Sequence, residues 1–189
     1  MSTITVVRKN GAVALAADTL WKDGSTMQRA SSLANPSKIL HDGDTYIAIT
    51  GSGAWGQVLK RYFAKLKEPP DLTSEHAIFE AVLRMHPVLK KRYGVNPNDG
   101  DRDAFESSRF CMLLANPGGA FAVYPDRSVS EFATFYAFGA GCEYALGAMH
   151  VAYSLMDQPE DIARIGVEAA AEFDEDTELP VETYRVELN

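Results

Sequence analysis

The pattern of hydrophobic and polar positions at the start of the chain predicts a hairpin of two strands. Residues 3–7 are rich in β-branched side chains, which suit a half-buried strand. Asn10-Gly11 then supplies the strongest short signal for a tight hairpin turn. Residues 12–17 form an unbroken apolar run, typical of a strand covered on both faces. Asp18 ends this run, and a carboxylate at the end of a buried strand needs a cation or several hydrogen-bond donors.

A second hairpin is expected further along, with strands at residues 38–40 and 45–50 around a turn at 41–44. The stretch 19–37 before it is polar and is expected to be irregular. After the hairpin, the glycine-rich segment 51–56 joins a strand to a helix, which brings backbone N–H groups close to anything in front of them. Because no Lys-Ser or Lys-Thr pair follows, this segment is not a phosphate-binding loop. An oxyanion site is the better chemical interpretation, with a plain helix start as the alternative.

The rest of the pattern predicts further helices and hairpins. Helices are expected at residues 53–66, from Thr73 or Ser74 to 93 with a kink at Pro87, at 141–156, and from a cap at Asp157 to 173. Strands are expected at 109–115, 120–124, 129–132, from 135 up to the helix at 141, and at 181–188, and a polar loop at 94–106. His76 and His86 have no partners at metal-ligand spacing and are expected to be ordinary surface or boundary residues.

Composition limits the classes of function. The 189 residues suit one domain spanning 1–189, and a hydrophobic content of 46% is ample for a core. The net charge of −8 argues against nucleic acid or an anionic membrane as the main partner. No apolar run approaches the ~20 residues of a membrane span, and the pattern of a signal peptide is absent. Cys111 and Cys142 form no metal or redox motif; a disulfide between them stays open, and a reduced cytoplasmic setting is the simpler expectation.

Ser2 carries the candidate chemistry. A small second residue normally allows removal of the initiator Met1, so that the chain would begin with a hydroxyl and a free α-amino group on one residue. Such an amine has a reference pKa of about 7.7–8.0 and can take up the proton of the hydroxyl near neutral pH. Many proteins begin with Met-Ser and have no such role, so the dipeptide alone does not establish one.

Several of these segments together resemble proteasome β-type subunits. They are, in order, Ser2-Thr3-Ile4, Val6-Val7-Arg8, Asn10-Gly11, the Ala-rich strand that ends at Asp18, Lys38-Ile39 and Gly51-Ser52-Gly53-Ala54. The sequence looks most like the bacterial HslV peptidase and its proteasome-like relatives. The resemblance is specific over residues 2–62, weakens through the middle of the chain and returns near Gly139. It implies an α+β fold, the four-layer αββα sandwich of N-terminal-nucleophile hydrolases, in which two antiparallel sheets are flanked by helices.

The resemblance also implies roles for single residues. Ser2 would be the nucleophile, at the position where the family usually has Thr, and its amine would be the base. Lys38 would lower the pKa of the nucleophile and of the amine through its charge. Asp18 would hold Lys38, which would explain the carboxylate at the end of a buried strand. The backbone N–H of Gly51 would bind the oxyanion of the tetrahedral intermediate.

Other positions support this site less completely. Asp174 and Thr177 have the spacing of the family's supporting Asp and Ser, and a solvated acidic helix end is the competing interpretation. The family's Gly-Ser-Gly segment corresponds to 139–141, where Ala140 lacks the serine hydroxyl. Ser2 keeps a hydroxyl but loses the methyl group that helps to fix the rotamer of threonine.

The expected function is peptide-bond hydrolysis through an acyl-enzyme on Ser2, in a homo-oligomer of stacked rings. The resemblance implies peptide or unfolded-protein substrates and an ATP-dependent unfoldase as a candidate partner, with no cofactor and no metal. Two alternatives stay open, a ring-forming scaffold with little or no activity and an amidohydrolase that acts on a small amide. The family's specificity pocket would involve residues near Trp21, Leu40, Ile49 and Gly53, which weakly favours apolar side chains.

Overall fold

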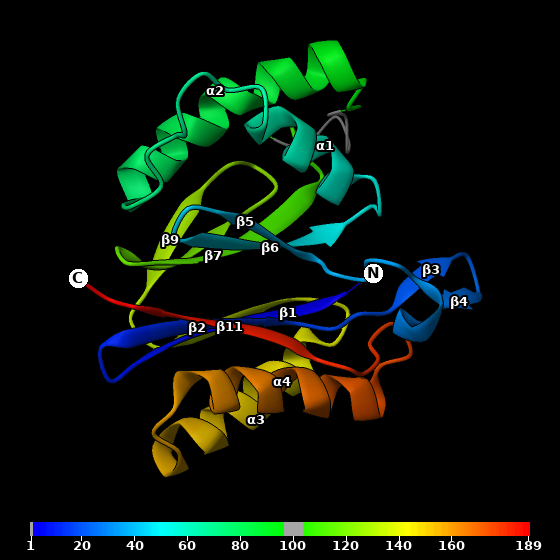
Figure 1. Cartoon of the computed structure of the whole chain (residues 1–189), viewed down its shortest axis with the longest axis vertical. Coiled ribbons are helices and arrows are strands. Elements are labelled where there is room, and N and C mark those ends of the chain that lie inside the picture. Colours follow the sequence, from blue (N-terminus) through cyan, green and yellow to red (C-terminus); the bar gives the residue numbers. More distant parts are fainter. Residues whose placement is uncertain (1, 97–103) are drawn as a thin grey trace.

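Two antiparallel sheets pack face to face between two layers of helices (Figure 1). The computed structural model describes residues 2–96 and 104–189; Met1 and residues 97–103 of the polar loop expected at 94–106 lie outside this range. The order of layers is helix, sheet, sheet, helix, so the four-layer αββα sandwich is confirmed. Within the described residues, no helix combines the length and the apolar character that a bilayer span requires.

The first sheet contains the N-terminal hairpin. Its strand order is β10-β1-β2-β11, with bounds β10 Phe135–Gly139, β1 Thr3–Lys9, β2 Ala12–Ala17 and β11 Glu182–Glu187. The turn between β1 and β2 places Asn10 at φ 50° and Gly11 at φ 78°, which is the pair of left-handed residues that a tight hairpin turn requires. The central strand β2 is buried along its whole length, as its apolar run predicts.

The second sheet collects the remaining hairpins in the order β5-β6-β7-β8-β9. Their bounds are β5 Ile39–Asp42, β6 Thr45–Gly51, β7 Phe110–Asn116, β8 Gly119–Val123 and β9 Val129–Phe132. The two sheets bury a shared apolar core, to which β1 and β2 contribute Val6, Val13 and Leu15 and the second sheet contributes Leu113 and Ala122. Close packing of this kind fixes the separation of the sheets, and with it the distance between the strand ends that carry polar side chains.

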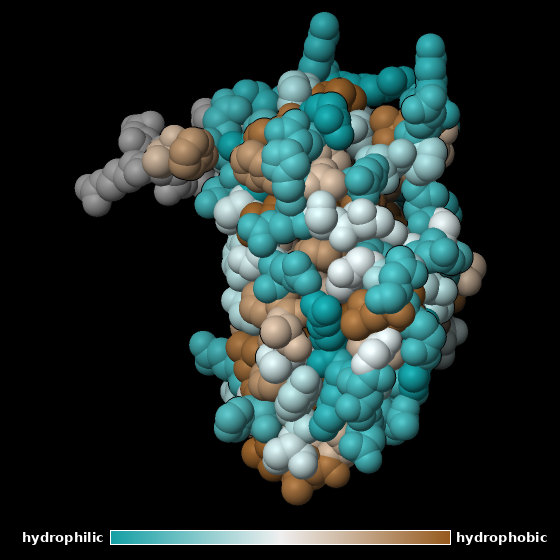
Figure 2. Space-filling model, turned by 90° about the vertical axis from the view of Figure 1, so that its left-hand side faces the viewer, coloured by the Kyte–Doolittle hydropathy of each residue, from teal (hydrophilic) through white to brown (hydrophobic). Residues whose placement is uncertain are grey.

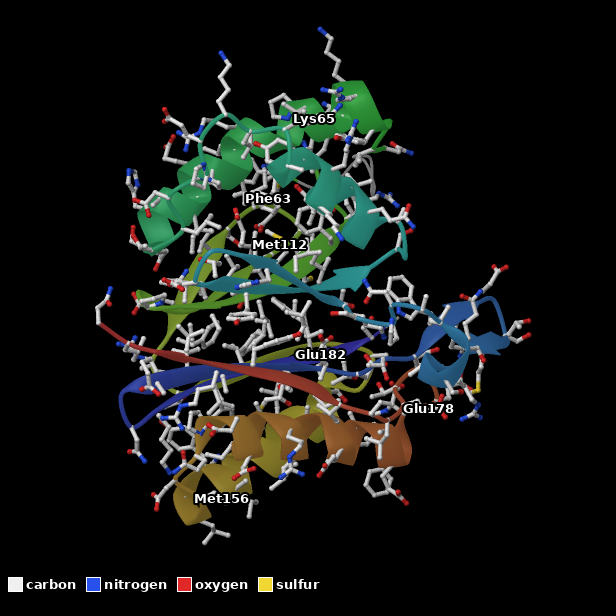
Figure 3. All side chains as sticks on the ribbon, in the orientation of Figure 1. Phe63, Lys65, Met112, Met156, Glu178 and Glu182 are labelled. Atoms are coloured by element: carbon white, nitrogen blue, oxygen red, sulfur yellow. The ribbon has the colours of Figure 1, made fainter. Side chains whose placement is uncertain are left out.

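A pair of helices covers each sheet (Figure 1). Helices α1 Trp55–Phe63 and α2 Glu75–Tyr93 lie on the second sheet, and α3 Cys142–Leu155 and α4 Pro159–Phe173 lie on the first. Figure 3 shows Phe63 and Met112 in the layer between α1 and the second sheet, where both belong to one apolar cluster. The predicted cap of α2 is confirmed, because the Ser74 hydroxyl accepts a hydrogen bond from the Ala77 N–H.

Helices α1 and α4 show the clearest differences from the predicted bounds, and α1 begins at Trp55 rather than at 53. Helix α1 ends at Phe63 rather than at 66, because residues 65 and 66 donate to carbonyls three residues back and so form a tighter turn. The cap of α4 is Gln158, and Pro159 is the first helical residue. The expected cap, Asp157, lies one residue further out, where its carbonyl accepts a hydrogen bond from the side chain of Asn10.

The stretch 19–37, expected to be irregular, contains a short hairpin and a turn of 3-10 helix. The elements are β3 Trp21–Asp23, β4 Thr26–Gln28 and η1 Ala30–Ser32. Ion pairs hold this segment to the chain after α4, where Lys22 contacts Asp176 at 2.5 Å and Arg29 contacts Glu178. The Asp23-Gly24 pair is a local turn signal that the prediction missed, and Gly24 has φ 58° in the turn between β3 and β4.

His86 was expected at the surface or at a boundary, and the structure buries it. Its side chain lies on α2, where Nδ1 is 3.1 Å from the Ser108 hydroxyl and Nε2 is 3.2 Å from Glu106. Burial lowers the pKa of His86, against the opposing effect of its hydrogen bond with Glu106. The imidazole thus ties α2 to the segment before β7.

Candidate active site

The ends of the first, second, fifth and sixth strands bring four of the predicted site residues to one edge of the sandwich. Ser2 immediately precedes β1, Lys38 immediately precedes β5 and Gly51 ends β6. These three residues line one cavity of about 60 Å³, which lies beside the hairpin formed by β3 and β4. Asp18 lies behind Lys38 and is completely buried. In Figure 1 the start of β1 lies on the side of the molecule that carries β3 and β4.

The Asp18 carboxylate accepts four hydrogen bonds from three donor groups. The Lys38 Nζ lies 2.8 Å from each carboxylate oxygen. The Thr3 N–H donates to Oδ1 at 2.9 Å and the Leu20 N–H donates to Oδ2 at 3.0 Å. This is the cation together with several donors that a carboxylate at the end of a buried strand requires.

Burial perturbs both members of this pair. It raises the pKa of the Asp18 carboxyl, against the opposing effects of the Lys38 charge and of the hydrogen bonds. It lowers the pKa of the Lys38 ammonium, against the attraction of Asp18. A lysine whose pKa is lowered inside a cavity is a common feature of catalytic sites. Lys38, whose pKa is lowered, therefore lines the same cavity as Ser2.

The backbone of Ser2 is held by the segment that follows β10. The Ala140 N–H donates to the Ser2 carbonyl at 3.0 Å. Gly139, at φ 109°, passes so close that a Cβ atom there would lie 1.7 Å from the same carbonyl oxygen. Only glycine fits this approach. Position 140 therefore contacts Ser2 through its main chain, and the missing serine hydroxyl leaves this contact unchanged.

Asp174 and Thr177 reach the site through Thr3. The Thr177 hydroxyl donates to Asp174 Oδ2 at 2.6 Å, and its oxygen lies 2.6 Å from the Thr3 hydroxyl. Since the Thr177 proton points to the carboxylate, Thr3 must donate to Thr177. The Thr3 oxygen in turn accepts from the Gly141 N–H at 3.1 Å. One directed chain thus runs from Gly141 through two hydroxyls to Asp174, next to Ser2.

Gly51 is fixed by a tryptophan and a carbonyl. A Cβ atom on Gly51, which has φ 139°, would lie 3.0 Å from the Arg109 carbonyl oxygen and 3.0 Å from the Trp55 ring. The Trp55 Nε1–H donates to the same carbonyl at 3.1 Å. These contacts hold the end of β6 in the wall of the cavity that Ser2 also lines.

The other candidate groups play no part in the site. Both cysteines are free, and burial raises the pKa of Cys111 to about 11 and raises that of Cys142, so neither thiol is poised as a nucleophile. Across residues 2–96 and 104–189, no group of three or more His, Cys, Asp or Glu side chains could hold a metal ion.

The structure thus brings together Ser2, Asp18, Lys38 and Gly51, and it places Thr177 in contact with Thr3, the residue after Ser2, with Asp174 bound to Thr177. Thr3 was not identified as a site residue from the sequence. Its partner Thr177 is 174 positions distant, so no local pattern could reveal the contact.

Solved structures similar to this chain include a bacterial and a eukaryotic protein. The chain is similar to "Thiobacillus denitrificans BPH", with 46% identity, a TM-score of 0.94 and coverage of 99% of this chain and 98% of that one. The same protein "in complex with Epoxomicin" gives 46% identity, a TM-score of 0.93 and 99% coverage of both chains. HslV from Trypanosoma brucei has a TM-score of 0.65 at 18% identity, covers 98% of this chain and 99% of its own, and shows the shared fold. No protein-family model and no curated protein matches the sequence.

Replacing Asp18 by asparagine tests the buried ion pair. In Asp18→Asn the Lys38 ammonium loses its counter-charge in a buried position, and we expect the free energy of unfolding to fall by about 3–5 kcal/mol. Asp161→Asn is the matched control, since Asp161 pairs with Arg164 at the surface, and it should change the stability by no more than about 1 kcal/mol. Urea unfolding measures both. Equal losses in the two variants would contradict the account of the pair.

Proposed function

Because the chain belongs to the family of proteasome β subunits and HslV-like peptidases, we propose that it hydrolyses peptide bonds with Ser2 as an N-terminal nucleophile. The observation that carries the proposal is the convergence of Ser2, Lys38 and Gly51 on one cavity, with Asp18 bound to Lys38. Homologues in this family are N-terminal threonine peptidases. Serine offers the same hydroxyl to the reaction.

The first half of the reaction transfers an acyl group to Ser2. Once Met1 is removed, the α-amine of Ser2 takes the proton of the hydroxyl, directly or through a water, while Oγ attacks the carbonyl carbon. The Gly51 N–H donates to the resulting oxyanion. The intermediate collapses by breaking the C–N bond, and the departing amine takes the proton from the Ser2 ammonium. The positive charge of Lys38 lowers the pKa of the α-amine, which keeps more of this base neutral at pH 7.

The second half releases the product. Water gives a proton to the Ser2 amine and attacks the ester carbon, so a second tetrahedral intermediate forms against the same N–H donor. Its collapse breaks the ester bond, frees the carboxyl product and returns the proton to the Ser2 oxygen. Thr3, Thr177 and Asp174 act as positioning residues, since their hydrogen-bond chain fixes the residue that follows the nucleophile.

We assign a homo-oligomer of stacked rings as the working form, and an apolar stripe on α3 supports it. Tyr144, Val151 and Leu155 are 48%, 59% and 77% exposed and lie on one face of the helix. Apolar atoms also lie at the foot of Figure 2, the end of the molecule that α3 and α4 cover in Figure 1. Large side chains of this kind, gathered on one face, favour a protein–protein contact. Peptides or unfolded proteins are the proposed substrates, with an ATP-dependent unfoldase as the candidate partner.

Covalent labelling tests the nucleophile. The wild-type protein incubated with epoxomicin should carry an adduct on Ser2, found by mass spectrometry of the N-terminal peptide, and Ser2→Ala should carry none. Lys38→Met should slow labelling by about 10²–10⁴-fold. It should also shift the increase of the labelling rate to higher pH, because the α-amine loses a nearby positive charge and its pKa rises. Lys60→Met, on the exposed surface of α1, is the matched control and should label like the wild type.

Three outcomes separate the candidate functions. An adduct on Ser2 together with cleavage of an unfolded protein supports the peptidase. An adduct with activity only on small acyl-amides would favour the amidohydrolase. A protein that forms rings but takes no adduct would be the scaffold, and the proposed reaction would be wrong.

Charge on the apolar stripe tests the ring assembly. We expect Leu155→Glu to lower the molar mass measured by light scattering from that of a ring to that of smaller species, because the glutamate would be buried at a contact between subunits. His150→Glu, which is on the same helix and off the stripe, should leave the molar mass unchanged. A wild-type protein that is monomeric at micromolar concentration would contradict the assembly.

A further inference from the structure

The cavity beside Ser2 is small and has a largely apolar wall. Its volume is about 60 Å³, and Trp21, Leu40, Ile49 and Gly53 are among its lining residues. A substrate bound with its carbonyl carbon at Ser2 would direct the side chain on the acyl side of the scissile bond toward this wall. The wall therefore determines which residue can precede the bond that is cleaved.

Trp21 forms part of the cavity wall, and two contacts hold its indole in place. The Nε1–H donates to the Pro36 carbonyl at 2.9 Å, which anchors one end of the ring system. The other end lies against Gly53, where an added Cβ atom would be 3.1 Å from the six-membered ring. The indole cannot swing away without losing this hydrogen bond, and it cannot move toward Gly53 without a clash.

The remaining space is too small for an aromatic side chain. An internal cavity that accepts benzene has a volume of about 150 Å³, more than twice the volume found here. The charges near the cavity do not favour an acidic side chain either. Lys38 is already paired with Asp18, and Lys22 with Asp176. A short aliphatic side chain is the group that fits both the volume and the charge.

From these observations we infer that Trp21 is the specificity-determining residue, and that it restricts the residue on the acyl side of the scissile bond to small aliphatic side chains such as alanine or valine. The inference rests on the proposed function, because it takes Ser2 as the point of attack. It goes beyond a general apolar preference, since large apolar side chains such as phenylalanine are excluded.

The test begins with peptide binding, which can be measured in a variant that does not hydrolyse the peptide. Acetyl-Ala-Ala-X-amide, with X as alanine, valine or phenylalanine, is titrated calorimetrically into the intact Ser2→Ala variant. We expect the alanine and valine peptides to bind at least about tenfold more tightly than the phenylalanine peptide, since a single methylene group in such a pocket is worth about 10–200-fold. Equal or tighter binding of the phenylalanine peptide, or no binding of any peptide, overturns the inference.

Variants in the wall should shift this preference in opposite directions. Adding Trp21→Ala should raise the affinity for the phenylalanine peptide until the tenfold discrimination is lost, and adding Gly53→Ala should weaken valine relative to alanine. Met27→Ala is the matched control, because Met27 lies on the same hairpin at 44% exposure and does not line the cavity. If the Trp21→Ala variant still bound the alanine and valine peptides about tenfold more tightly than the phenylalanine peptide, the assignment of Trp21 as the specificity-determining residue would be wrong.

Cleavage of the same sequences as coumarin amides by the Ser2 protein separates the two proposals. Cleavage that prefers alanine or valine supports both. Cleavage that prefers phenylalanine overturns the specificity inference and leaves the peptidase standing. No cleavage of any substrate, with the binding preference intact, counts against the peptidase and supports the assignment of Trp21.

Discussion

The buried ion pair between Asp18 and Lys38 is the constraint on which the rest of the candidate active site depends. Asp18 has no exposed surface, so its charge must be met inside the protein. Lys38 and the backbone N–H groups of Thr3 and Leu20 meet it, and they come from three different segments. Satisfying one carboxylate thus forces the start of β1, the end of β2 and the start of β5 to converge. Ser2 is carried into the cavity beside Lys38 by the same contacts.

Thr3 connects this ion pair to the other half of the site. Its N–H binds Asp18, and its hydroxyl joins the chain that ends at Asp174. The residue next to Ser2 is therefore fixed on both its main chain and its side chain. Ala140 has no hydroxyl to add, but its N–H still holds the Ser2 carbonyl. Orientation at this end of β1 is thereby supplied by threonines and main-chain donors.

Local patterns predicted the features that local physics determines. The Asn10-Gly11 turn, the apolar run of β2 and the Ser74 cap each depend on a few neighbouring residues, and each is confirmed. The gathering of Ser2, Lys38 and Gly51 was expected from a family resemblance and not from spacing, because no sequence rule brings strand ends together.

The features that were missed depend on contacts between distant residues. The hairpin of β3 and β4 had one local sign, the Asp23-Gly24 turn, but it is held by an ion pair between Lys22 and Asp176, which are 154 positions apart. His86 is buried because Ser108 and Glu106 supply partners from a segment beyond α2. Thr3 acquires its role through Thr177. In each case the sequence around the residue contains no sign of its partner.

The central claim is that Ser2 presents its own α-amine to its hydroxyl beside Lys38, and the N-terminal peptide of the purified, catalytically active protein tests it most directly. The account predicts, by tandem mass spectrometry, a peptide that begins at Ser2 and carries an unmodified α-amine. An active protein whose N-terminal peptide still begins with Met1 would contradict the account, because the amide nitrogen of Ser2 could not then take up the proton of the hydroxyl.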